Sequence, residues 1–418
     1  MINLREPFIC FGAAIVLVAC LTSESRAEAR FGASLSVREE YNDNILLTKE
    51  NRQDDFITTV SPSIVLGYKT SLMDLALDYG LIFKFYLNHN EKNETSLNGA
   101  QRAKLDTTMQ PSRYLSIKLF DEYKRVPIDA KRASTVNNTL VNLTDANTFR
   151  VNPQLQYPLG SSLSLTSGYM YENNWYRTNG NNAQNHTVTA QLNKEISRNL
   201  QLWLSYGYTF HRPSDTALGN VDDTYDLQQG SVGGSWQIMP KLTVTGSVGK
   251  VFYYYENRPN TNSLNLNASG SYQISDALSI NGGYAEGFSS SVTKGVVRTK
   301  STTGGLNYAG NLTMGLAGFH TIGDYQETNR EDRTTGTTVS LGIPLTSSIK
   351  LQASGNYAYR EFLPDGETSH RYGGTVSFSY PLRLVTISCG YSYDVNDSSS
   401  DFNSFKNNIA WIQTGISY

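Results

Sequence analysis

The sequence predicts an all-β protein: a transmembrane antiparallel up-and-down β-barrel of about twenty strands (18–22). Three observations predict it, namely the composition, the alternation of apolar and polar residues, and the alternation of short and long connections. Charged residues make up only 17% of the 418 residues, whereas Tyr (27) and Gly (34) are abundant. In a barrel, alternate residues of each strand face lipid and a polar lumen. The lipid-facing residues are apolar and the lumen-facing ones need not be charged, so few charges are expected.

The composition also excludes other classes. A helical membrane protein would need runs of about 18 or more apolar residues, and the chain has none. A nucleic-acid-binding protein usually carries a basic excess. Here 35 Lys and Arg stand against 37 Asp and Glu, so we expect no nucleic-acid partner.

Residues 1–29 have the layout of a secretory signal peptide. An apolar run over 8–21 follows Arg5, and Ala27-Glu28-Ala29 has the small-residue pattern of a cleavage site. The apolar run is too short to span a bilayer. The alternative is a lipoprotein signal, Leu17-Val18-Ala19-Cys20, with Cys20 lipidated, but a lipid anchor is unusual in a chain that is itself expected to lie in the membrane. We therefore expect export, cleavage after Ala29, and a barrel over 30–418 in the outer membrane of a Gram-negative bacterium.

From Arg30 onward, apolar and polar residues alternate in runs of about 9–14 residues. This is the length that a tilted strand needs to cross a bilayer. In the run over 73–85, Leu75 and Leu77 alternate with Asp74 and Asp78. We expect the leucines to face lipid and the aspartates to face the lumen. A soluble sandwich would have shorter strands, mostly of about five or six residues.

The connections alternate in length. Ten long polar connections, such as 88–95, 172–185, 212–223 and 394–406, lie between nine short turns. Nineteen connections give twenty strands, with short periplasmic turns and longer outer loops. The short turns are expected at 69–71, 110–113, 159–161, 197–199, 239–241, 275–277, 309–311, 345–348 and 381–383.

Tyrosines gather at both ends of the expected strands, as interfacial girdles require. High β-propensity alone would explain their abundance but not this placement. The chain ends on an aromatic residue, and Ile412, Ile416 and Tyr418 share one face of the last strand. This ending resembles the signal by which the barrel-assembly machinery recognises its clients. We therefore expect that machinery and outer-membrane lipid as partners.

One stretch near the start carries a family resemblance. It contains Glu40-Tyr41-Asn42-Asp43-Asn44-Ile45, then Asp55-Phe56-Ile57-Thr58-Thr59-Val60-Ser61-Pro62, and later Leu77-Asp78-Tyr79. Over 31–86 the chain resembles the outer-membrane β-barrel porins of type 2, a family often found beside exopolysaccharide and PEP-CTERM gene sets. The resemblance implies an outer-membrane channel for export of a secreted polysaccharide. It carries over no functional residues.

The expected lumen wall is charged in the early strands and neutral afterwards. The early charges are Asp74, Asp78, Lys84, Arg102, Lys104 and Lys118. A neutral wall favours the passage of hydrated neutral solutes or glycans over the selective passage of ions. Its expected members are Ser164, Thr166, Gln201, Thr243, Thr245, Asn265, Asn267, Ser279, Asn281, Gln352, Ser377 and Ser388.

The longest connection, 124–147, is the candidate constriction loop. It carries the cations Lys124, Arg125, Lys131 and Arg132, followed by the apolar residues Val136, Leu140, Val141 and Leu143. Apolar residues in an outer loop gain free energy by burial, and the barrel mouth is the nearest shelter. The alternative is an ordered loop that caps the rim without entering the lumen.

The mature chain carries no motif for catalysis or for a cofactor. It has no P-loop, no dinucleotide-binding fingerprint, no H-E-x-x-H and no C-x-x-C-H. We therefore expect no enzymatic activity, no cofactor and no metal site. Two hypotheses stay open: a porin-like channel for a polysaccharide or small hydrophilic solutes, and a receptor, adhesin or structural barrel that acts through its outer loops.

Overall fold

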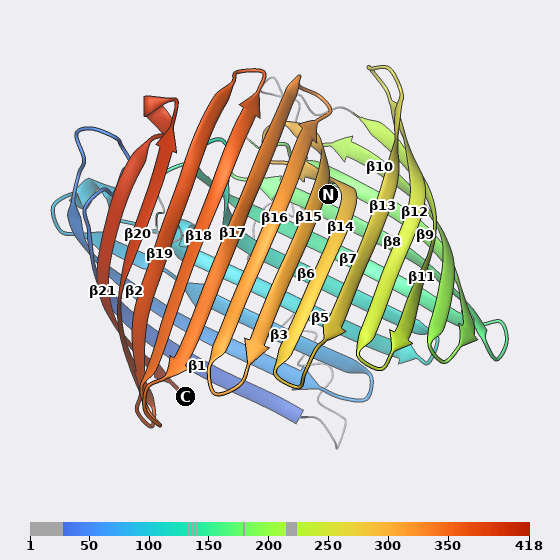
Figure 1. Ribbon diagram of the computed structural model, residues 1–418, viewed down its shortest axis with the longest axis horizontal. Helices are drawn as coiled ribbons and strands as arrows, with labels where there is room; N and C mark the ends of the chain where they lie inside the picture. The colour runs from blue at the N-terminus through green and yellow to red at the C-terminus, as the bar shows by residue number, and fades with distance from the viewer. Residues whose placement is uncertain (1–27, 133, 136–137, 139, 179, 215–223) are drawn as a thin grey trace.

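The computed structural model describes residues 28–132, 134–135, 138, 140–178, 180–214 and 224–418 (Figure 1). Residues 1–27 of the expected signal peptide, Cys20 included, lie outside the described residues, as does Val136. Glu28 and Ala29 already belong to the first strand, where they pair with Lys69 and Tyr68.

The described strands form one closed antiparallel barrel, which confirms the expected fold. The β3 and β4 segments hold one common register against β2 and are separated only at Ile82, so the 21 labelled strands make a twenty-stranded barrel. The strands are β1(Glu28–Asn42), β2(Asp55–Lys69), β3(Met73–Leu81), β4(Phe83–Tyr86), β5(Gln101–Ser112), β6(Leu115–Pro127), β7(Leu143–Pro158), β8(Leu163–Tyr176), β9(Ala183–Ser197), β10(Leu200–Pro213), β11(Tyr225–Met239), β12(Leu242–Tyr255), β13(Thr261–Gln273), β14(Leu278–Ser291), β15(Gly295–Ala309), β16(Thr313–Tyr325), β17(Arg330–Pro344), β18(Lys350–Leu363), β19(Glu367–Pro381), β20(Val385–Ser398) and β21(Phe405–Ser417).

The barrel closes between β1 and β21. Ser34 pairs with Ser417, and the ladder continues to Asn42 opposite Ile409. Beyond it, the backbone N–H of Tyr418 donates to the carbonyl of Ala33 at 2.9 Å, and Ala33 donates in return at 3.1 Å. The last residue therefore completes the ladder, at the same end of the barrel as the short turns.

The nine short turns lie where the alternation placed them, whereas the opposite connections are mostly shorter than expected. Strand β8 extends to Tyr176 and β9 begins at Ala183, both inside the expected loop 172–185. Two opposite connections, 292–294 and 364–366, have only three residues. Polar residues such as Asn174 continue the hydrogen-bonded ladder past the apolar belt, because pairing between neighbouring strands does not require apolar side chains.

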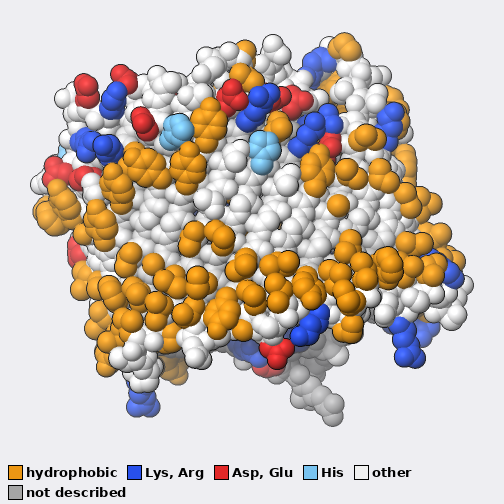
Figure 2. Space-filling model, in the orientation of Figure 1, with side chains coloured by type: hydrophobic (Ala, Val, Ile, Leu, Met, Phe, Trp, Pro, Cys, Tyr) orange, Lys and Arg blue, Asp and Glu red, His pale blue; other side chains and the backbone are white. Residues whose placement is uncertain are grey.

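Cross-strand partners share a face, so the register divides every strand into an outer and an inner set. Leu204 is 60% exposed on the outer face, beside Val232 and Leu192. Its neighbour Ser205 lies on the inner face opposite Ser231. Figure 2 shows hydrophobic side chains gathered in a broad band around the visible face, with most charged side chains above it. A bilayer requires an apolar outer band of this kind.

The same register places Leu75 and Asp74 on opposite faces. Leu75 pairs with Tyr68 on the outer face, where it packs in an apolar cluster with Met73, Leu77 and Leu105. Aromatic side chains mark both ends of the outer face. Tyr157, Tyr272, Tyr380 and Tyr418 are exposed near the short turns, and Tyr41, Phe56, Phe210 and Tyr372 are exposed toward the other end.

Helix is almost absent from the described residues. The helical elements in the described part of the chain are the single turns η1(Asn90–Lys92), α2(Leu97–Ala100) and η2(Asp401–Asn403). Among the described residues, no helix has the length and apolar character needed to cross a membrane.

Replacing Tyr418 with Asp is expected to impair assembly. The ring is 87% exposed on the outer face, whereas the closing hydrogen bonds are made by the backbone. The substitution therefore removes the terminal aromatic group and leaves the ladder intact. Outer-membrane yield and heat-modifiable electrophoretic mobility measure the effect, with Tyr418→Phe as the control that keeps the ring. Normal yield and mobility for Tyr418→Asp would contradict the expectation.

Candidate pore and its mouth

The inner face is predominantly neutral and polar from β8 to β20. All twelve residues expected on this neutral wall lie on the inner face: Ser164 pairs with Asn193, Thr245 with Ser269, and Gln352 with Ser377. Hydroxyl groups bond across neighbouring strands, as between Ser205 and Ser231 at 2.6 Å. These twelve residues present hydrogen-bonding groups to the lumen and carry no charge; the charged inner-face residues of the later strands lie toward the mouth.

The early strands carry a ladder of opposite charges on the inner face. Asp78 pairs with Lys104, which pairs with Glu122 on the next strand. Cross-strand pairs of opposite charge stabilise a sheet and offset one another electrostatically. The other expected lumen charges, Asp74, Lys84, Arg102 and Lys118, also lie on inner-face positions in the register.

Those four charges have different surroundings. Lys69 donates to Asp74 at 2.7 Å near the short turns. Lys84 is buried on β4, next to the backbone of Glu94. Arg102 lies at 3.9 Å from Asp145 at the other end of the barrel. Lys118 lies between the polar residues Thr108 and Asn152 of the neighbouring strands.

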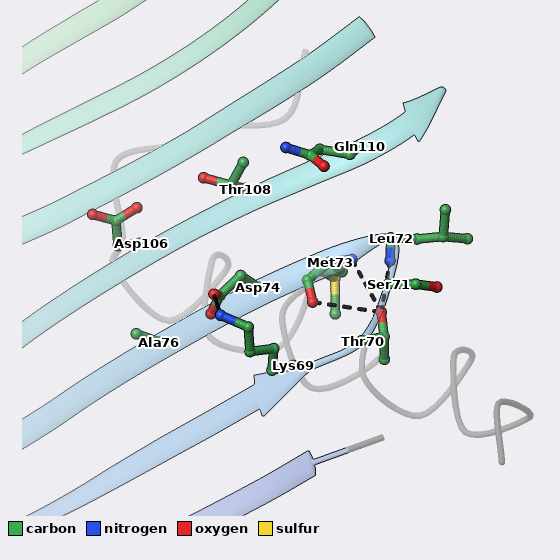
Figure 3. A pocket seen from close by; sticks show the side chains of 10 residues that line it. All are labelled: Lys69, Thr70, Ser71, Leu72, Met73, Asp74, Ala76, Asp106, Thr108 and Gln110. Atoms are coloured by element: carbon green, nitrogen blue, oxygen red, sulfur yellow. Dashed lines mark hydrogen bonds and ion pairs between the residues drawn. The ribbon is translucent and has the colours of Figure 1, made fainter. Parts of the chain in front are cut away.

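A cavity of about 460 Å³ opens on the inner face beside the turn between β2 and β3. Figure 3 shows Asp74, Asp106 and Thr108 projecting from β3 and β5, with Lys69 beside Asp74. Two carboxylates and one ammonium group therefore line this cavity.

The expected constriction loop is shorter than 124–147. Lys124 and Arg125 lie in β6, where Lys124 bonds to Glu122 at 2.5 Å and Arg125 bonds to Glu94 at 2.7 Å. Placing these two cations in the loop was wrong, because the β6–β7 ladder continues to the pair Pro127 and Leu143. The loop itself comprises residues 128–142, which we call the mouth loop.

The mouth loop crosses to the opposite wall, where ion pairs hold it. Asp129 bonds to Arg330 of β17 at 2.9 Å. Lys131 contacts Asp365 at 2.8 Å and Glu367 at 2.9 Å, both on the far side of the barrel. The hydrogen bonds to Asp365 and then to Glu367 raise the pKa of Lys131, so this ammonium group stays charged around neutral pH.

The loop lies on the inner side of the wall. Arg371, on the inner face of β19, donates to the carbonyl of Ser134 at 2.6 Å. Arg360, on the inner face of β18, donates to the carbonyl of Ala130 at 3.3 Å. The guanidinium of Arg132 lies 4.5 Å from the ring centre of Phe402.

The apolar end of the mouth loop is buried at the rim. Val141 and Leu140 pack with Leu47 and Phe405. Asn138 donates to the carbonyl of Ile45 at 2.7 Å, so the loop also contacts the β1–β2 connection. This burial provides the free energy that draws an outer loop into the mouth.

The tip of the β14–β15 hairpin contributes to the same closure. β13 and β14 pair only from Asn267 opposite Ala285 to Gln273 opposite Ser279. Beyond that point the hairpin leaves β13, and the carbonyl of Val292 accepts from the backbone N–H of Asn181 at 2.6 Å. Thr293 contacts the carbonyl of Ile128 at 3.5 Å. The mouth is thus narrowed from two sides.

Sequence reasoning missed several inner-face residues at the mouth. Arg360 and Arg371 have the same parity as Gln352 and Ser377 on their strands, so the alternation alone could have found them. Arg38, whose guanidinium lies 4.4 Å from the ring centre of Trp411, is another missed inner-face cation. The contact between Arg38 and Trp411 depends on the closure between β1 and β21, which joins residues from the two ends of the chain.

Comparisons with known proteins establish the fold. No family model matches the sequence, and no curated protein matches it. A variant of the ferric enterobactin receptor PfeA of Pseudomonas aeruginosa, in complex with enterobactin, aligns with a TM-score of 0.52 at 9% identity, over 94% of this chain and 82% of that chain. The ferric citrate transporter FecA in the unliganded form aligns with a TM-score of 0.50 at 11% identity, over 93% and 78%. The resemblance to the type 2 porins stays a prediction.

Proposed function

We propose that this protein is an outer-membrane channel for hydrophilic solutes whose mouth is narrowed by the mouth loop. The polar inner face carries the proposal. Hydroxyl and amide groups removed from water without hydrogen-bond partners would each cost free energy. A wall of such groups across more than ten strands is stable when water fills the lumen, and a water-filled barrel with an apolar outer belt conducts small solutes.

A secreted polysaccharide is the proposed cargo, with small hydrophilic solutes as the alternative. Residues such as Asn265, Asn267 and Gln352 offer both donors and acceptors, which match the hydroxyl groups of a glycan. The type 2 porin resemblance over 31–86 supports the same cargo. The proposal also includes export of the protein itself, directed by a cleaved signal peptide, and its insertion into the outer membrane by the barrel-assembly machinery.

A second function is favoured by one specific observation. The mouth loop and the β14–β15 tip both occupy the mouth, and the loop is held by Asp129 and Lys131. A receptor, adhesin or structural barrel that acts through its outer loops would need no open lumen. In the channel, by contrast, this closure is a constriction that narrows the passage.

Planar-bilayer recordings of the full-length protein separate the two functions. The channel predicts discrete conductance steps, together with swelling of proteoliposomes in isotonic solutions of neutral sugars. Protein that has been heated until its folded electrophoretic mobility is lost serves as the control. Correctly folded protein that inserts but gives neither steps nor swelling would contradict the channel and favour the receptor barrel.

A further inference from the structure

A second cavity, of about 480 Å³, lies beneath the mouth loop. Its floor is the inner face of β14, β15, β16, β18 and β19, and its roof is the loop. The residues that line it and that matter here are Arg132, Ser134, Ser289, Ser291, Arg360 and Arg371. The lining also includes Asp129, so the cavity combines three guanidinium groups and hydroxyl groups with one carboxylate, which already pairs with Arg330. This cavity lies at the opposite end of the barrel from the cavity beside the β2–β3 turn.

Arg360 and Arg371 are incompletely satisfied in this cavity. Each donates a hydrogen bond to one carbonyl of the mouth loop, at 3.3 Å and 2.6 Å. The Nε atoms of both side chains are buried and have no hydrogen-bond partner among the described residues. A guanidinium group has five N–H donors, so both arginines retain donors for a ligand.

The neighbouring carboxylates do not neutralise this arginine pair. Arg330 already engages Asp129 at 2.9 Å and Asp332 at 2.7 Å. Asp394 lies on the strand next to Arg371, yet within the described structure neither Arg360 nor Arg371 forms an ion pair. Asp332 and Asp394 act on Arg360 and Arg371 only from beyond contact distance. Two adjacent, partly buried cations without a contacting carboxylate are costly, and a bound anion would reduce that cost.

We propose that the cavity binds an oxyanion, a carboxylate or a phosphate, carried by a hydroxylated solute. Guanidinium groups present forked pairs of N–H donors that match the two oxygens of such an anion. The side chains of Ser289 and Ser291 bind hydroxyl groups of the same solute. This inference deepens the proposed channel function and rests on it, because it gives the passing solute a charged subsite at the constriction.

Calorimetric titration of the full-length protein in detergent tests the site directly. The probes are glucuronate, inorganic phosphate and, as the neutral comparison, glucose, all at one fixed ionic strength. We expect glucuronate or phosphate to bind and glucose not to bind. The double variant R360Q/R371Q should weaken the binding at least tenfold, because each hydrogen bond to a charged group contributes strongly to affinity.

A matched control removes the same charge from the outer face. Lys300 and Arg333 project outward on β15 and β17, so K300Q/R333Q should leave oxyanion binding unchanged. Folded electrophoretic mobility confirms that both double variants assemble. If glucuronate alone binds, the solute carries a carboxylate, and if phosphate alone binds, it carries a phosphate. Wild-type protein that binds neither, or equal loss in the two double variants, would overturn the site.

Bilayer recordings distinguish failure of this site from failure of the channel. Oxyanion binding in the calorimeter without conductance would overturn the channel and leave the site standing. The protein could instead conduct without binding glucuronate or phosphate, and without any reduction of its current by either anion. That result would overturn the site and leave the channel standing. Current block in the wild type that R360Q/R371Q relieves supports both.

Discussion

Replacing the mouth loop with a two-residue Asn-Gly turn is expected to raise the single-channel conductance several-fold. Pro127 and Leu143 lie directly opposite each other at the ends of β6 and β7, so a two-residue turn can close the shortened hairpin without changing its register. The loop now spans the mouth to reach Asp365 and Arg371. Its removal leaves the β14–β15 tip as the remaining obstruction.

The same variant should shift ion selectivity modestly toward cations. The mouth loop carries Lys131 and Arg132 against Asp129, so its deletion removes one net positive charge from the mouth. Fixed charges beside a pore bias which ions enter. The shift should be larger at 0.1 M than at 1 M salt, since the Debye length falls from about 10 Å to about 3 Å. Reversal potentials in salt gradients measure it.

The variant R132Q is the matched control, because it removes one positive charge from the mouth and keeps the loop and its ion pairs through Asp129 and Lys131. It should shift selectivity toward cations without the several-fold rise in conductance. A deletion that folds normally but keeps wild-type conductance and reversal potential would show that the loop does not narrow the conducting path.

The local features of the barrel could be predicted from the sequence because they depend on neighbours within one or two strands. The alternation of Leu204 and Ser205 shows which face of β10 is turned to lipid. The turn after Lys69 shows where β2 ends and the chain reverses. Apolar alternation weakens where a strand leaves the bilayer, although pairing continues. The ends of the strands, including Lys124 and Arg125 in β6, were therefore misplaced.

The mouth could be predicted only in part, because it is built from contacts between distant segments. Burial of apolar loop residues such as Val141 followed from their chemistry. The partner of Lys131 did not, because Asp365 lies 234 residues farther along the chain. The loop also had to cross the lumen before Arg371 and Ser134 could meet. Alternation identifies an inner-face arginine, but it does not identify the loop that lies above it.

Substituting Leu204 with Arg should destabilise the barrel more than substituting the neighbouring Ser205. Leu204 lies in the outer belt beside Val232 and Leu192, where a mid-membrane Arg costs roughly 2–4 kcal/mol. Ser205 faces the lumen, where an Arg remains hydrated. The Ser205→Arg variant loses one hydrogen bond to Ser231, worth about 1 kcal/mol.

Denaturant-induced unfolding from lipid vesicles gives both free energies of unfolding. Leu204→Ala belongs in the series, because it removes the same side-chain contacts without placing a charge in the bilayer, and so isolates the cost of the charge. Since successive residues of a strand face opposite sides, a register shift of one residue would exchange the two positions. Equal costs for the two Arg variants, or a larger cost at Ser205, would therefore show that the inner and outer faces of β10 are assigned wrongly.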